Sequence, residues 1–195
     1  MRCPYCRSAL AETAAECPSC RLTLERAGKL LGPVPRLEQG VADLAGVLPR
    51  GDAARIAKEI SRLRWAFPQT EVHVLLHLFP REHPFELHVF WLFNCGRFSS
   101  EDQKGGENHA ILLALDPEQG RSALMVGYGL EPFLGDEAMD HLLELAEPAW
   151  IAGDWTRGIL EVLGGLARLL ESAAVETASG FGLSALANPK RPGEF

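Results

Sequence analysis

The pattern of apolar and polar positions along the chain predicts an alternation of helices and strands. Between residues 53 and 67 the apolar side chains recur at spacings of three and four, which predicts a helix that Asp52 caps and Pro68 ends. Residues 71–79 alternate between two faces instead, which predicts a strand closed by Pro80. This helix and strand open the main domain of the protein.

The remaining elements expected from the pattern follow in the second half of the chain. They are a helix over 85–94, strands over 110–115 and 122–126, and helices over 136–146 and 154–170. The turn sequence at 116–120 is of hairpin length, so the two strands are expected to be antiparallel, and the polar segment 99–108 is typical of a loop. This order of elements implies a three-layer α/β domain with a mixed sheet.

Changes in composition divide the chain into four parts. A cysteine-containing module occupies residues 1–27, and a linker rich in proline and glycine follows over 28–38. The α/β domain covers 39–174, and the segment 175–195 is expected to be a flexible tail. With 195 residues, the chain has no room for a second full-sized core.

Four of the five cysteines form two copies of one motif, Cys3-Pro-Tyr-Cys6 and Cys17-Pro-Ser-Cys20. Two such turns, separated by ten residues, can place four thiolates on one Zn²⁺ ion in a tetrahedral arrangement. Because all four positions would then belong to cysteines, no open position would remain for a catalytic water molecule. The motifs therefore predict a structural zinc site in a small zinc ribbon.

Two alternatives to zinc are a redox dithiol and a pair of disulfides. A redox Cys-x-x-Cys usually begins a helix within a βαβ pattern, and no such pattern occurs this close to the start of the sequence. Zinc ribbons commonly carry a glycine after the second cysteine of each motif, whereas Arg7 and Arg21 occupy those positions here. The ribbon is expected to dock onto protein rather than nucleic acid, because its few cations lack an aromatic stacking set.

The net charge of −7 argues against a generally basic nucleic-acid-binding protein. That excess lies in residues 131–161, which hold eight carboxylates and one cation, Arg157. The chain begins without the apolar core of a signal peptide, and its longest apolar stretch, 159–170, is too short to span a bilayer. We therefore expect a cytoplasmic protein without a transmembrane segment, in which the cysteines stay reduced.

Three stretches of the sequence resemble the TPM domain family. They are Ile111–Asp116, the segment Val126-Gly-Tyr-Gly-Leu-Glu-Pro-Phe-Leu-Gly-Asp136, and Ala152–Ile159. The segment Val41–Leu48 is similar to the opening of the family pattern, so the resemblance covers about residues 38–172.

The resemblance implies an α/β/α sandwich with a mixed sheet, here preceded by a zinc ribbon. Members of the family have been proposed as acid phosphatases, as calcium-binding modules and as assembly or repair factors for membrane complexes. The sequence departs from the family pattern at His109, Gly135 and Trp155, where glycine, threonine and tyrosine are usual.

Four carboxylates near the family motifs form a candidate cation site. They are Asp43, Glu131, Asp136 and Asp154. If their loops converge at one sheet edge, the clustered oxygens suit a hard cation such as Ca²⁺ or Mg²⁺. The alternative is that Asp136 and Asp154 cap the helices that they precede.

A phosphatase built on these residues would need metal-activated water, because the sequence offers no nucleophilic cysteine motif. Phosphate binding usually uses cations or helix amides, and Arg157 is the only cation of the acidic segment. We therefore favour a binding or scaffold protein with a protein partner. His73 and His77 are expected to be hydrogen-bonded histidines at an interface, and Cys95 to be a core residue.

Overall fold

The computed structural model describes residues 2–11, 13–34, 40–96 and 106–180. Its elements, in chain order, are α1 (Leu24–Leu31), β1 (Val41–Asp43), α2 (Asp52–Ala66), β2 (Glu71–Leu76), α3 (Phe85–Cys95), the 3₁₀ helix η1 (Gly106–His109), β3 (Ala110–Asp116), β4 (Arg121–Val126), α4 (Asp136–Ile151) and α5 (Trp155–Gly180). The two cysteine motifs precede α1.

The four strands form one mixed sheet in the order β1-β2-β3-β4. β1, β2 and β3 are parallel, with Val41 opposite Val74 and Val74 opposite Leu113. β4 returns antiparallel to β3, with Asp116 opposite Arg121. The antiparallel hairpin expected from residues 110–126 is therefore confirmed.

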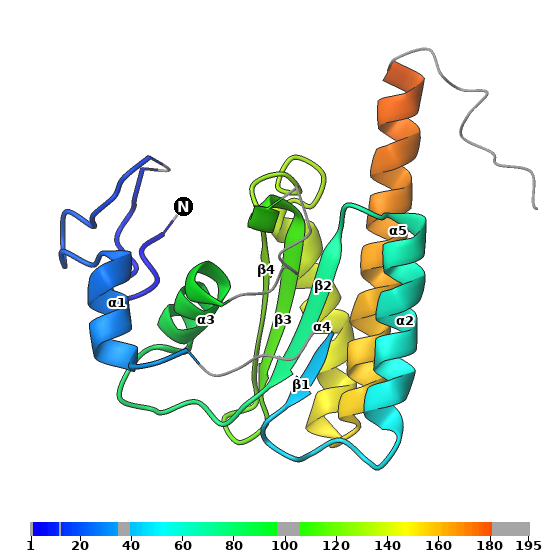
Figure 1. Ribbon diagram of the computed structural model, residues 1–195, viewed down its shortest axis with the longest axis horizontal. Helices are drawn as coiled ribbons and strands as arrows, with labels where there is room; N and C mark the ends of the chain where they lie inside the picture. The colour runs from blue at the N-terminus through cyan, green and yellow to red at the C-terminus, as the bar shows by residue number, and fades with distance from the viewer. Residues whose placement is uncertain (1, 12, 35–39, 97–105, 181–195) are drawn as a thin grey trace, which may run out of the picture.

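Helices cover both faces of the sheet (Figure 1). On one face α2, α4 and α5 enclose a core with side chains of β2 and β3 such as Val74 and Leu113. On the other face α3 packs on Leu75 and Leu112, and the cysteine module with α1 lies outside α3. The molecule is thus a three-layer α/β/α sandwich with a mixed sheet and a small N-terminal module, as expected.

The sequence pattern did not predict two short elements, β1 and α1. β1 has three residues, too few to show an alternation, and it becomes a strand because it pairs with β2. α1 covers Leu24–Leu31 and so crosses residue 27, where the module was expected to end. Most of the expected loop 99–108 and part of the expected linker, residues 35–38, lie outside the described residues.

Two helices run beyond their expected ends. α4 continues through Pro148 to Ile151, because Ala149 and Trp150 are buried and their packing outweighs the missing amide of proline. α5 extends to Gly180, so its last turns project beyond α2 in Figure 1. The remainder of the expected tail, 181–195, lies outside the described residues.

The helix starts also differ from expectation at two aspartates. Gly51 and Gly135 occupy the N-cap positions of α2 and α4, and neither has a side chain to cap its helix. Asp52 and Asp136 are instead the first helical residues, where a carboxylate still interacts favourably with the helix dipole.

Candidate metal centre and the acidic loops

The two cysteine motifs adopt the same backbone turn. In the first, the amide of Arg7 donates to the carbonyl of Cys3 at 3.0 Å, and in the second, the amide of Arg21 donates to the carbonyl of Cys17 at 2.8 Å. Both arginines have left-handed backbone, with φ of 63° and 57°. This conformation explains why glycine is common at these positions of zinc ribbons, and shows that arginine is accommodated here at some strain.

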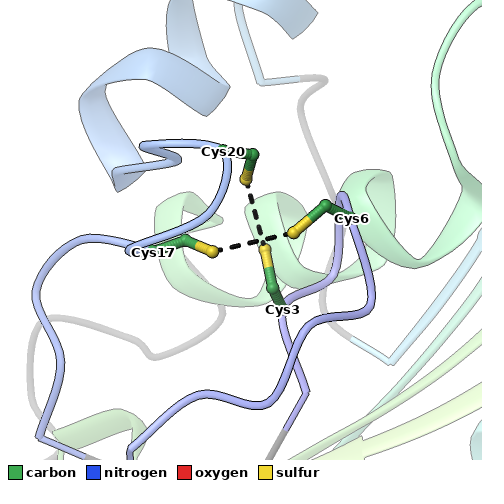
Figure 2. Close-up of side chains that lie close together, drawn as sticks. All are labelled: Cys3, Cys6, Cys17 and Cys20. Carbon is green, nitrogen blue, oxygen red and sulfur yellow. Dashed lines mark hydrogen bonds between the residues drawn. The ribbon is translucent and has the colours of Figure 1, made fainter.

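The four cysteine side chains converge on one point (Figure 2). The sulfur of Cys3 lies 3.7 Å from that of Cys20, and the sulfur of Cys6 lies 3.7 Å from that of Cys17. All four sulfurs lie within 4.8 Å of one another. Zn–S bonds of about 2.3 Å in a tetrahedron require sulfurs about 3.8 Å apart. The donor set therefore fits a zinc ion with four thiolate ligands.

The thiols of the site differ in acidity. Hydrogen bonds between Cys6 and Ser8, through both the side chain and the backbone of Ser8, lower the pKa of Cys6 to about 6. Burial raises the pKa of Cys20 to about 12. A bound Zn²⁺ ion would overcome this difference, because a thiol that coordinates zinc is deprotonated.

The cysteine module packs into the core of the α/β domain. Cys3 and Cys17 are fully buried and belong to the same apolar cluster as Phe85, Leu87 and Trp91 of α3. The four-cysteine site therefore lies against the helical layer formed by α3.

Charged groups reinforce this interface. The carboxylate of Glu86 in α3 forms ion pairs with Arg7 of the module and with Arg121 of β4. The ring of Tyr5 lies 6.3 Å from that of His83, just before α3. One glutamate thus links the module, α3 and the edge of the sheet.

The candidate carboxylates lie at two opposite ends of the sheet. Asp43 ends β1, at the carboxyl end of the three parallel strands. Because β4 is antiparallel, it ends with Val126 opposite Ile111, near the start of β3. Glu131 and Asp136 follow β4 and therefore lie at the end of the sheet opposite to Asp43.

Asp154 lies at the same end of the sheet as Asp43. The hydroxyl of Thr156 at the start of α5 donates to Asp52 at the start of α2, which follows the loop leaving β1. Among the described residues, only the four cysteines form a group of three or more potential metal ligands. The structure does not bring the four carboxylates together.

Two of these aspartates organise backbone instead. The carboxylate of Asp43 accepts hydrogen bonds from the amides of Gly46, Val47 and Leu48, at 2.8, 3.2 and 2.8 Å. Asp154 accepts from the amide of Arg157 at 3.0 Å and so caps α5. The capping role that the sequence left open for Asp154 is confirmed.

The glycines around Tyr128 serve the fold of their own loop. Neither Gly127 nor Gly129 has a positive φ. A β-carbon at Gly129 would lie 2.9 Å from the carbonyl oxygen of Asn108 and 2.7 Å from a ring nitrogen of His109. The close approach is thus to the chain itself, while Tyr128 remains 65% exposed.

A buried carboxylate that was not a candidate from the sequence lies at the carboxyl end of the parallel strands, the end at which Asp43 also lies. Asp116 is fully buried and accepts from the amides of Phe79, Glu118 and Gln119, as well as from the side chain of Gln119. Its position at the start of the hairpin turn was visible in the sequence, but its burial was not. Asp116 ties the end of β3 to the chain that leaves β2.

The two histidines of the β2 region have separate environments. His73 is 6% exposed, and burial lowers its pKa from 6.5 to about 4. His77 follows the end of β2, and burial lowers its pKa while Asp116 opposes the shift. Neither belongs to a group of potential metal ligands in the described part of the chain.

These observations define a class of protein, an α/β/α domain that carries against one helical layer a four-cysteine module whose geometry fits a metal ion. A model of the TPM phosphatase family, described as the TPM domain, matches residues 41–169. The chain belongs to the TPM domain family.

Solved structures agree with this fold. The N-terminal domain of a protein from P. gingivalis is 21% identical and superposes with a TM-score of 0.56, covering 72% of this chain and 90% of that one. The N-terminal domain of cg2496 from Corynebacterium glutamicum is 19% identical, with a TM-score of 0.51 and coverage of 71% and 84%. No curated protein sequence matches the chain significantly.

Helix length and apolarity also bear on membranes. Within residues 2–11, 13–34, 40–96 and 106–180, no helix combines the length and the apolar character needed to cross a bilayer.

Proposed function

We propose that this protein is a binding or assembly module whose TPM domain is stabilised by a structural zinc ion in the N-terminal ribbon. The observation that carries the proposal is the burial of Cys3 and Cys17 in the same apolar cluster as α3. A zinc ion held there would stabilise the ribbon, since about 25 residues cannot build a core alone. It would also stabilise the α3 layer, on which the ribbon packs.

The hydrogen bonds that the candidate carboxylates already accept support a binding function over a catalytic one. Asp43 and Asp154 already hold backbone amides, which is a structural use of a carboxylate. In the described residues no group of three histidine, aspartate or glutamate ligands gathers around one point. The protein partner and the cytoplasmic location, where four reduced thiolates would bind zinc, stay predictions of this proposal.

Metal analysis and melting curves test the zinc site. We expect one zinc ion per chain, and a lower melting temperature after removal by a strong chelator, because the metal links the ribbon to the α3 layer. Cys17→Ser should lose the zinc, whereas Cys95→Ser, outside the site, should retain it. Equal zinc content in both variants, or a melting temperature unchanged by chelation, would contradict the proposal.

A metal-dependent phosphatase is the second candidate function, and the name of the matching family model, TPM phosphatase, favours it. Its test is turnover of a generic phosphate ester with Mg²⁺ or Ca²⁺ present. Turnover that Asp136→Ala abolishes without loss of folding would place catalysis above binding. No turnover with either cation would remove this candidate.

Cation binding at the acidic loops stays a prediction of the sequence and of the family resemblance. It concerns Ca²⁺ or Mg²⁺ at Asp43, Glu131, Asp136 or Asp154. Calorimetric titration of the zinc-loaded protein would show heat and a rise in melting temperature if either cation binds. A gel shift at low salt likewise tests nucleic-acid binding by the ribbon, for which we expect no shift.

A further inference from the structure

The outer edge of β4 has no partner strand among the described residues, since β4 ends the sheet order. The amide of Gly127 donates to the carbonyl of Ala110 at 2.9 Å, which sets the phase of the antiparallel pairing. In such a pair, alternate residues face the neighbouring strand. The backbone amides and carbonyls of Ser122, Leu124 and Val126 are therefore directed outward, where another strand can pair with them.

A groove of about 660 Å³ lies at the start of this edge, where the β3–β4 turn and the first two residues of β4, Arg121 and Ser122, face α4. Three carboxylates spaced along α4, Asp140, Glu144 and Glu147, line one wall. Apolar groups lie at its end, including Trp155 and Ile151, and Ile151 is 79% exposed. The groove thus combines an unpaired strand edge, an acidic wall and an apolar end.

The arginine that contributes to the groove does not neutralise this wall. The guanidinium of Arg121 pairs with Glu86 and lies 5.0 Å from the centre of the Phe85 ring, so it is directed to the α3 face of the sheet. In the described part of the chain, none of these three carboxylates forms an ion pair with lysine or arginine, and Glu144 lies 3.8 Å from a ring nitrogen of the exposed His141. The wall keeps its negative charge.

β4 also has few of the features that protect an edge strand, since its one charged residue, Arg121, lies at the first position and pairs with Glu86. Its sequence, Arg-Ser-Ala-Leu-Met-Val, contains no proline or lysine, and it pairs with β3 without a bulge. Natural proteins block exposed edges with such devices unless another chain uses the edge.

We propose that an extended basic segment of a protein partner adds to the sheet along β4 and lies in the groove against α4. This inference rests on the proposed binding function and names its partner class. Alternate residues of a strand are about 6.7 Å apart, and residues four apart on a helix rise about 6 Å, so lysines or arginines at alternate positions match Asp140 and Glu144. Peptides that bind by adding a strand combine backbone pairing with side-chain recognition in this way.

A second copy of this chain fits the edge less well. Pairing two β4 edges would bring two acidic α4 walls toward each other, and like charges in an interface are unfavourable. Charge complementarity therefore selects a basic segment over self-association.

The test uses the full-length zinc-loaded protein and a fluorescent peptide of alternating lysine and valine. We expect binding that weakens with salt, and a loss of about tenfold or more in affinity for Glu144→Lys. Glu137→Lys makes the same charge change on α4 outside the groove and is the matched control. Ser122→Pro removes an outward amide without removing a bond to β3, and should also weaken binding.

A second peptide, methylated on alternate backbone nitrogens, separates strand pairing from charge attraction. It should bind about tenfold more weakly or worse, because it cannot donate to the edge of β4. Equal binding of the two peptides, or equal loss in Glu144→Lys and Glu137→Lys, would overturn the proposal. A concentration-dependent dimer that Ser122→Pro abolishes would overturn it in favour of a second copy.

The same preparations distinguish this inference from the proposed function. Absence of peptide binding by a protein that holds zinc and turns over no phosphate ester overturns the groove assignment alone. Phosphate turnover that requires Asp136 overturns the binding function, and peptide binding sensitive to Glu144→Lys would still support the groove.

Discussion

Gly165 of α5 lies directly against the side chain of Leu142 of α4, at a point where a β-carbon would overlap the leucine. This close approach lets the two helices pack together over the sheet. We expect Gly165→Ala to lower the unfolding free energy by about 1–3 kcal/mol, because an added methyl group overfills a packed interface. Urea unfolding measures the effect.

The neighbouring glycine is the matched control. A β-carbon at Gly164 would come no closer than 3.6 Å to Arg168, which is ordinary contact. Gly164→Ala should therefore stabilise the helix by up to about 1 kcal/mol, since alanine has the higher helix propensity. A shift of both variants in the same direction would contradict this account of the α4–α5 interface.

The left-handed backbone of Arg21 predicts a stabilising substitution in the ribbon. Arg21→Gly should remove a strain of about 1–2 kcal/mol, partly offset by the greater freedom of glycine in the unfolded chain. We expect a higher melting temperature of the zinc-loaded protein. Arg21→Ala removes the same side chain but keeps the β-carbon, so it should bring no such gain.

The burial of His73 predicts a dependence of stability on pH. Because burial lowers the pKa of His73 from 6.5 to about 4, the unfolded chain binds a proton at a higher pH than the folded chain does. The free energy of unfolding is therefore not reduced by His73 above pH 6.5. It falls between pH 6.5 and pH 4, with a slope of up to about 1.4 kcal/mol per pH unit from this group. His73→Leu should flatten the measured slope of the unfolding free energy in this range.

A second buried histidine limits the effect expected of His73→Leu. His88 is buried too and its pKa is also lowered, so part of the slope should remain in His73→Leu. A slope identical in His73→Leu and in the wild type would contradict the prediction.

The hydrogen bond from Thr156 to Asp52 predicts a difference that disappears in acid. The buried Thr156 hydroxyl donates to Asp52 at 2.7 Å, and this bond is the main cause of a lowered pKa of Asp52. The stabilisation is present above the unfolded pKa of about 3.9 and is lost as the pH falls through the lower folded value.

Thr156→Val should therefore destabilise the protein at neutral pH and much less in strong acid, as measured by chemical unfolding at several pH values. Thr177→Val is the control, because the hydroxyl of Thr177 is exposed and donates only to the carbonyl of Ala173. A constant difference between Thr156→Val and the wild type at every pH would show that the bond does not act through the charge of Asp52.

Much of the fold could be predicted because its elements carry strong local patterns. The periodicity around Ile56 and Ile60 and the hairpin at 110–126 correspond to α2 and to β3–β4. The prediction failed where packing overrides local preference, as in α4, which continues through Pro148. It also failed for β1, whose three residues are a strand only because β2 pairs with them.

The two candidate sites differ in the same way, because one depends on local turns and the other on strand pairing. The four cysteines act through two short, repeated turns, so their spacing alone predicted a convergence that the sulfur positions support. The positions of the four candidate carboxylates, by contrast, depend on the directions of strands that are far apart in the sequence. The antiparallel hairpin was expected from the sequence, but β1 and its parallel pairing were not, so the sequence did not show that Glu131 leaves the sheet at the end opposite to Asp43.

The sequence by itself determined the order of the main elements, the cysteine ligand set and the confinement of the negative charge to residues 131–161, because these follow from spacing and composition. Only the tertiary structure decided where that charge acts. It distributed the carboxylates between two ends of the sheet and one wall of a groove, and it placed the ribbon on α3. These are relations between residues far apart in the chain, and they arise only when strands pair and layers pack.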